Sequence, residues 1–186
     1  MDKALGWIGE IFQTLLRLLP WLVVVPATHG GVAFVRGHRI KEWKPGLHWY
    51  WPVATQYKLM TTVRQTQMVT SKVVMTKDQQ TVIVGALVTY FVDDVVSAIA
   101  KIADVPSDII ERSQGAMLAE VSENTLEEIQ RNRLRFNKNL AEKISATLEG
   151  YGVHILQAQL TEFAPCRAHA IRGAASLGHY TLWSGF

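Results

Sequence analysis

The feature that most constrains the fold is a run of twelve residues, Thr81–Val92, without a charged side chain. Apolar side chains occur on both of its alternating faces. One face carries Val82, Val84, Ala86, Val88 and Tyr90, and the other carries Ile83, Leu87 and Phe91. Strands that are apolar on both faces are typical of the interior of a sheet. We therefore expect residues 81–92 to form a central strand with both faces buried.

Weaker β patterns lie on either side of this run. Residues 31–36 read as a short strand, residues 63–75 are rich in Val, Thr and Met, and residues 153–163 read as a closing strand. Turn sequences separate these segments at 37–38, 44–46 and 77–80. The chain therefore begins its globular part with antiparallel strands.

Helical signals follow the central run. The pair Asp93-Asp94 suits the start of a first helix that reaches residue 103, and Pro106 suits the first turn of a second that continues to about residue 121. Thr125 followed by Glu128 is a capping box at the start of a third helix. That helix directs Ile129, Phe136, Leu140, Ile144 and Leu148 toward a core. Strands, then helices, then one strand indicate an α+β fold.

The first 25 residues have a different pattern. On a helical wheel, residues 2–19 place six apolar side chains within an arc of about 100°, opposite polar ones. These are Leu5, Ile8, Phe12, Leu15, Leu16 and Leu19, and Pro20 ends the helix. We interpret residues 1–25 as a membrane-associating amphipathic helix followed by a hydrophobic segment.

The depth of this segment is open. The uninterrupted apolar run, residues 18–25, is shorter than the roughly 20 residues that a span needs, and Trp7, Trp21 and Leu22 suit an in-plane position at the headgroup level. We favour in-plane attachment. A spanning or re-entrant segment, a signal peptide and a helix packed on the domain core are the alternatives.

The formal net charge of +3 hides three charged blocks. Residues 26–64 carry six cations and one acid, residues 93–128 nine acids and two cations, and residues 131–143 five cations and one acid. The first block includes Arg36, Arg39, Lys41 and Lys44. Cations beside a membrane helix favour anionic lipid, so we assign these four to membrane binding.

The other two blocks suggest an oligomer interface. If the acidic and basic helices lie on opposite flanks, unlike charges meet between neighbouring subunits, and such head-to-tail contacts close into a ring. The candidates are Glu123, Glu127, Glu128, Arg131, Arg133, Arg135 and Lys138. The alternative is that both blocks are only solvated helix faces.

Residues 171–186 form a short C-terminal tail. It carries Tyr180, Trp183 and Phe186 in its last seven residues, with no Asp, Glu, Lys or Arg among them. Solvated tails are usually polar and charged, so we expect this one to be an interaction element for a neighbouring subunit or a partner. The alternative is packing on the closing strand of its own chain.

Signatures of catalysis and cofactor binding are absent from the sequence. His29, His38 and His48 are nine and ten residues apart, a spacing that does not by itself converge on a metal. The single cysteine, Cys166, cannot form an internal disulfide, and no phosphate-binding loop or hydrolase motif occurs. Aromatic residues do not interleave with a basic stripe as in single-strand binders. We expect no catalytic residue, cofactor, metal or nucleic acid.

Several motifs in order resemble the SPFH or band 7 domain, the family of stomatin, prohibitin, flotillin and HflK/HflC-like proteins. The sequence Gly-Val-Ala-Phe-Val-Arg-Gly is followed by Pro-Gly-Leu-His and an aromatic-Pro pair, and then by a Thr-x-Asp turn. The remaining matches are the Tyr-x-x-x-Asp strand ending, Thr-Leu-Glu-Glu-Ile, and the closing Tyr-Gly-Val and Phe-Ala-Pro. They place the domain at residues 26–170.

The resemblance implies a non-enzymatic, membrane-attached homo-oligomer. Such domains pack side by side into rings or cages that organise membrane lipid and protein, and some regulate a membrane protease. It implies a location at the inner or cytoplasmic membrane, with the domain on one side. The alternative function is a soluble adaptor or chaperone-like regulator whose N-terminal helix docks on a partner protein.

Overall fold

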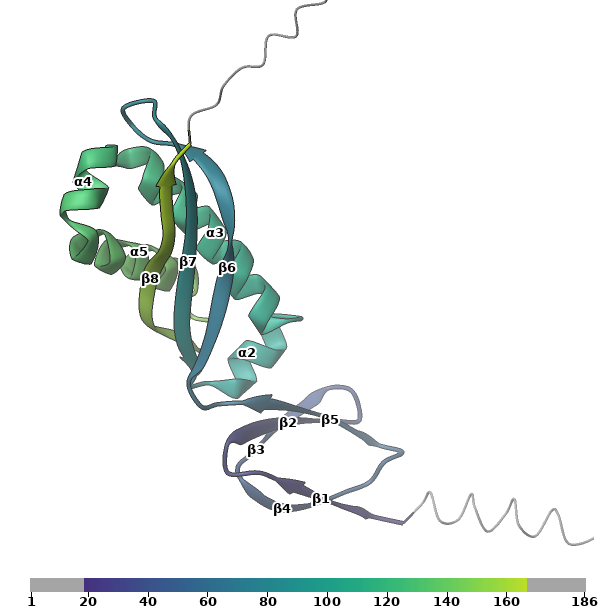
Figure 1. Cartoon of the computed structure of the whole chain (residues 1–186). Coiled ribbons are helices and arrows are strands. Elements are labelled where there is room, and N and C mark those ends of the chain that lie inside the picture. Colours follow the sequence, from purple (N-terminus) through teal and green to yellow (C-terminus); the bar gives the residue numbers. More distant parts are fainter. Residues whose placement is uncertain (1–18, 167–186) are drawn as a thin grey trace, which may run out of the picture.

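The computed structural model describes residues 19–166 and places them in two parts that lie end to end (Figure 1). The predicted N-terminal helix with Leu5, Trp7, Ile8, Phe12, Leu15 and Leu16 lies outside the described residues, as does the tail with Tyr180, Trp183 and Phe186. Leu19 is the first described residue and is exposed.

The first part, which we call the β-subdomain, consists of five short strands. They are β1 (Trp21–Val25), β2 (His29–Val35), β3 (Arg39–Trp43), β4 (Gly46–Tyr50) and β5 (Thr55–Thr61). The strands β1 and β4 pair as an antiparallel ribbon, and β2 lies between β3 and β5 in a second sheet. Of these elements, the sequence patterns indicate only the strand at β2 and the turns around it.

A small aromatic cluster joins the ribbon to the second sheet. Trp43, which is 3% exposed, stacks on His48 with ring centroids 5.0 Å apart and on Tyr57 at 5.5 Å. Tyr50 contacts both Trp43 and Tyr57 edge-on. The buried apolar residues of this part are Val25, Ala33 and Trp43.

The second part, the α/β-subdomain, has three strands and four helices. The sheet order is β6 (Gln65–Met75), β7 (Thr81–Val92) and β8 (Val153–Pro165), so β7 is central, as predicted. The helices are α2 (Val95–Lys101), α3 (Val105–Glu123), α4 (Leu126–Arg131) and α5 (Arg133–Thr147). The observed order of strands, helices and closing strand agrees with the α+β prediction.

Only one face of β7 is fully buried. Val82, Val84, Ala86, Val88 and Tyr90 are each 0–1% exposed and pack in the core with the helices. On the opposite face Ile83, Leu87 and Phe91 are only half-buried. The expectation that both faces are buried was therefore wrong. Within residues 19–166 the helices form the core against the face that carries Val82 and Tyr90, and no helix covers the other face.

The helix starts follow the predicted signals. Asp94 caps α2 by accepting from the Ser97 amide at 3.0 Å, and both bonds of the Thr125–Glu128 capping box are formed. The predicted third helix is interrupted at Asn132, which separates α4 from α5. Its core residues were predicted correctly: Ile129, Phe136, Leu140, Ile144 and Leu148 are all buried.

A close contact between Gly152 and Asp94 fixes the turn that leads from α5 into β8. The carbonyl oxygen of Gly152 accepts hydrogen bonds from the Asp93 and Asp94 amides at 3.0 and 3.2 Å. Gly152 has φ +72°, and a Cβ there would overlap the Asp94 carbonyl oxygen. Only glycine fits both requirements.

Side chains of α5 bind the free edge of β8 at Leu160. The guanidinium of Arg133 donates to the Leu160 carbonyl at 2.9 Å, and the Leu160 amide donates to Asn137 Oδ1 at 3.1 Å. Both backbone groups of Leu160 are thereby satisfied without another strand.

The two parts are held together by direct contacts. A Cβ at Gly30 in β2 would meet Cγ2 of Val95 in α2, so the strand and the helix are in van der Waals contact there. From β5, the Lys58 ammonium donates to the Ala103 carbonyl at 2.9 Å.

Candidate functional site

The outward face of the β1–β4 ribbon is apolar and uncovered in the described structure. The register pairs Leu22 with Trp49 and Val24 with Leu47, so these four side chains share one side of the ribbon. They are 47%, 69%, 63% and 57% exposed, respectively. Trp51, just after β4, is 54% exposed. We call these five residues the apolar ribbon face.

Strand alternation explains how this face arises. Every residue of β1 is apolar, in the sequence Trp-Leu-Val-Val-Val, but only one side of a strand can face the small core. Val23 and Val25 face that core, which leaves Leu22 and Val24 outside. Single exposed apolar residues are ordinary, whereas a contiguous group marks a binding surface.

Only part of this face was predicted from the sequence to bind membrane. Trp21 and Leu22 are exposed on β1, in a segment expected to precede the domain. Val24, Leu47, Trp49 and Trp51, which complete the face, were not among the predicted residues. The apolar run 21–25 and the alternate residues 47, 49 and 51 would have indicated a shared face, had the pairing of β1 with β4 been known.

The four predicted lipid-binding cations belong to the same subdomain. Arg36 lies in the turn between β2 and β3, Arg39 and Lys41 lie on β3, and Lys44 lies between β3 and β4. All four are exposed. The β-subdomain therefore combines an exposed apolar face with an excess of exposed positive charge.

The acidic and basic helices pack against each other. Lys143 of α5 contacts Glu120 and Glu123 of α3 at 2.7 and 2.5 Å, and Asn139 donates to Glu120 at 3.3 Å. Burial lowers the pKa of Lys143, but its hydrogen bonds to both carboxylates outweigh burial, and the net pKa is raised. Part of the acidic block and part of the basic block therefore meet within the subunit, where Lys143 compensates the buried Glu120.

Most of the predicted interface charges have partners within the chain. Glu127 pairs with Arg131 at 2.6 Å, and Lys138 lies 3.7 Å from Glu142. Glu128 is part of the capping box, and Arg133 is bound to β8. These side chains remain candidates for an interface. Glu127, Arg131 and Lys138 already have ion-pair partners within the chain, whereas Glu128 and Arg133 are held by hydrogen bonds to uncharged groups.

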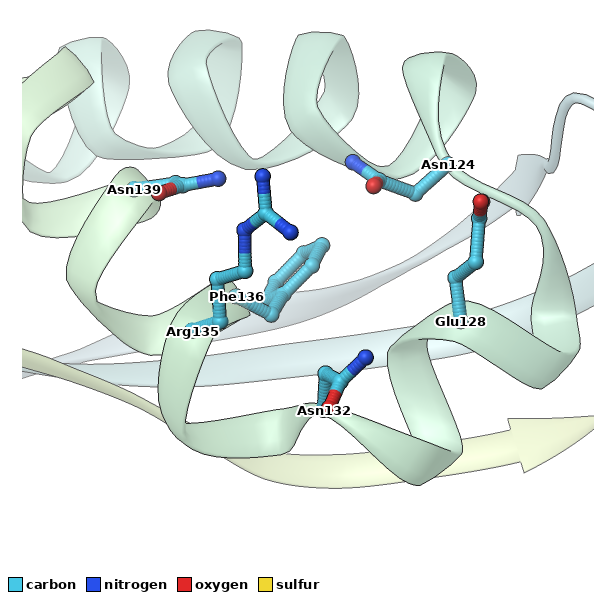
Figure 2. Close-up of a pocket in the computed structure, with 6 residues that line it drawn as sticks. All are labelled: Asn124, Glu128, Asn132, Arg135, Phe136 and Asn139. Carbon is cyan, nitrogen blue, oxygen red and sulfur yellow. The ribbon is translucent and has the colours of Figure 1, made fainter.

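Arg135 points into a polar pocket between α3, α4 and α5 (Figure 2). The pocket has a volume of about 170 Å³ and is lined by Asn124, Glu128, Asn132, Arg135, Phe136 and Asn139. Asn124 and Asn139 already donate to Glu120. Hydrogen bonds from Thr125 hold the pKa of Glu128 below its ordinary value, so this carboxylate is poorly suited to act as a base.

The described residues show no constellation for metal chemistry. Within residues 19–166, no group of three or more His, Cys, Asp or Glu side chains is arranged to hold a metal ion. His29 contacts Thr61, His38 contacts the Arg36 carbonyl, and His48 stacks on Trp43. Cys166 is partly buried, and its amide donates to the Thr81 carbonyl at 2.7 Å. Across this same stretch, no helix has the length and hydropathy to cross a bilayer.

Comparison with known proteins identifies relatives of this chain. Residues 23–174 match the family model described as SPFH domain / Band 7 family. An uncharacterized protein of Methanocaldococcus jannaschii is 30% identical over 165 residues, covering 88% of this chain and 82% of that protein. An uncharacterized protein of Archaeoglobus fulgidus is 26% identical over 156 residues, covering 84% of this chain and 63% of that protein.

Proposed function

This chain belongs to the SPFH domain / Band 7 family, and from that premise we propose that it is a membrane-attached, homo-oligomeric scaffold of the stomatin and prohibitin type. The family consists generally of non-enzymatic scaffolds that associate with membranes and oligomerise. In our proposal this protein assembles into a ring or cage on the inner or cytoplasmic membrane. There it organises lipid and protein or regulates a membrane partner such as a protease.

The single observation that carries the proposal is the apolar ribbon face. Fully burying a side chain such as Leu or Val is worth roughly 1.5–3 kcal/mol each, so even partial insertion of this face favours an apolar phase. Tryptophan prefers the headgroup level, which suits Trp49 and Trp51 at the margin of the face. Nearby cations add about 1 kcal/mol each at an anionic surface.

The N-terminal helix is a second attachment element in this proposal. Residues 1–18 lead directly into β1, so a helix in the plane of the membrane and the ribbon face would act on the same surface. Two linked contacts bind more strongly than either one alone, because the second forms at a high effective concentration.

Assembly rests on the family and on one exposed side chain. Leu134, at the start of α5, is 87% exposed and lies between Arg133 and Arg135. A large apolar side chain with this exposure suits a subunit contact. Since the nearby acids are paired internally, apolar contact at Leu134 is a stronger candidate than charge attraction.

The test is co-sedimentation of the full chain with vesicles. We expect Leu22→Ser combined with Trp49→Ser to lower the partition coefficient at least about tenfold, which corresponds to about 1.4 kcal/mol. Leu118→Ser is the matched control, because it removes an exposed leucine of α3 in the other subdomain and should leave partitioning unchanged. Circular dichroism would check that each variant stays folded.

Two outcomes would contradict the proposal. Equal partitioning of the double variant and the wild type would remove the ribbon face from the membrane contact. A wild type that does not sediment with either neutral or phosphatidylserine vesicles would favour the soluble adaptor. Size-exclusion chromatography with light scattering in mild detergent tests assembly separately, and a monomeric wild type would refute the ring.

A further inference from the structure

The outer face of the β6–β7–β8 sheet is a second uncovered apolar surface, distinct from the ribbon. The register places Met68 opposite Leu87 and Val73 opposite Ile83, so these side chains share one side of the sheet. Met68, Val73 and Met75 are 61%, 64% and 57% exposed. The outer sheet face, as we use the term, comprises Met68, Val73, Met75, Ile83, Leu87 and Phe91.

We propose that the C-terminal segment, residues 167–186, folds back onto the outer sheet face of its own chain and covers it. This inference concerns the domain alone and does not depend on membrane attachment. It assigns the aromatic tail to a surface that the sequence predicted to be buried and that the described residues leave open.

The point at which the chain leaves the sheet supports this occupant. The Cys166 amide donates to the Thr81 carbonyl, which holds the end of β8 beside the start of β7. Val73 pairs with Ile83 at this same end, and Met75 pairs with Thr81. The segment that follows Cys166 therefore begins at the end of the sheet where Val73 and Met75 lie, with β7 between.

Length and composition fit the surface. The distance along β7 from Thr81 to Phe91 is about 34 Å at 3.4 Å per residue, and twenty residues reach that far either as an extended chain or nearly so as a helix. After Arg172 the segment contains no Asp, Glu, Lys or Arg. Its large apolar residues are Ile171, Leu177, Tyr180, Leu182, Trp183 and Phe186.

Charge is complementary where the segment would cross the sheet. Gly85 has no side chain, and above it the Ser71 hydroxyl donates to the Glu162 carboxylate. Glu162 thus places a negative charge on this face. The cations of the segment, Arg167 and Arg172, come first along the chain, so a segment folded back over the sheet would carry them toward this carboxylate.

Methionine oxidation tests the proposal, because Met68 and Met75 lie on the face itself. The full chain in mild detergent is exposed to hydrogen peroxide at several protein concentrations, and oxidation of each methionine is followed by mass spectrometry. In the wild type we expect Met68 and Met75 to oxidise several-fold more slowly than in the variant Tyr180→Ser/Trp183→Ser/Phe186→Ser. Met117, which is 0% exposed in the core, reports on global unfolding.

A matched variant tests whether the protection comes from the apolar character of the tail side chains. Tyr180→Leu/Trp183→Leu/Phe186→Leu keeps the apolar character and should retain most of the protection. Equal oxidation in the wild type and the serine variant would overturn the proposal. Protection that disappears on dilution would also overturn it, because the cover would then come from a second copy.

Discussion

The two subdomains differ in how many of their apolar residues they bury. The α/β-subdomain, with one contribution from β2, buries twenty-five apolar residues in one continuous core, from Val32 to Leu160. The β-subdomain buries three in its own cluster, around Trp43, and leaves Leu22, Val24, Leu47 and Trp49 in contact with solvent. Its strands are no less apolar, but a ribbon and a three-stranded sheet enclose little volume. The α/β-subdomain thus supplies nearly all of the buried core, whereas the β-subdomain has only a small cluster to hold its strands.

The largest expected difference between the regions concerns leucine truncation. Leu140→Ala removes a 0% exposed side chain from the core between α5 and the sheet and should cost about 2.7–5 kcal/mol of unfolding free energy. Leu47→Ala, on the apolar ribbon face, should change it by no more than about 0.5 kcal/mol. Urea unfolding curves would measure both. Similar costs would show that the ribbon face is covered in the free protein.

A second contrast compares two glycines with the same backbone conformation. Gly37 in the β2–β3 turn has φ +73° and open space where a methyl group would lie, whereas Gly152 has φ +72° and the Asp94 backbone in the way. Gly37→Ala should cost about 1–2 kcal/mol through conformation alone. Gly152→Ala adds overlap and should cost about 2–4 kcal/mol. Equal losses of thermal stability would mean that the β7–β8 junction relaxes around the methyl group.

The smallest expected effect is a loss of stability of the α/β-subdomain at acidic pH. Hydrogen bonds from Thr76, Ser97 and Thr125 lower the pKa values of Asp78, Asp94 and Glu128. A carboxylate whose pKa is lower in the folded state contributes its stability above the unfolded pKa, 3.8 for Asp and 4.5 for Glu, and loses it as pH falls through the folded value.

Far-ultraviolet circular dichroism between pH 7 and pH 2 would follow the helices, while near-ultraviolet signals would include the Trp43 cluster. We expect the midpoint of thermal unfolding of the helices to fall as pH drops below the ordinary carboxylate range. Asp94→Asn should reduce this slope, because the amide still caps α2 but no longer titrates in this range. A slope unchanged by that substitution would assign the acid dependence to other groups.

The sequence predicted elements whose signals are local. The uncharged run from Thr81, the Asp94 cap and the Thr125–Glu128 box each depend on neighbouring residues. The central strand and both caps were confirmed, although only one face of the strand is fully buried. The ribbon was missed because β1 and β4 are short, and their pairing depends on contacts across twenty residues of chain. Likewise, the buried Glu120 and its partner Lys143 could not be predicted, because pairs between α3 and α5 are set by helix packing.

The hydrogen bonds at Leu160 bear on how β8 could pair with a strand of another molecule. Proteins confined to a membrane and crowded together risk joining sheets edge to edge, which leads to irreversible fibrous aggregation. Arg133 and Asn137 occupy the backbone groups of Leu160 that an incoming strand would need. An incoming strand therefore cannot pair through Leu160, which interrupts any continuous edge-to-edge ladder along β8.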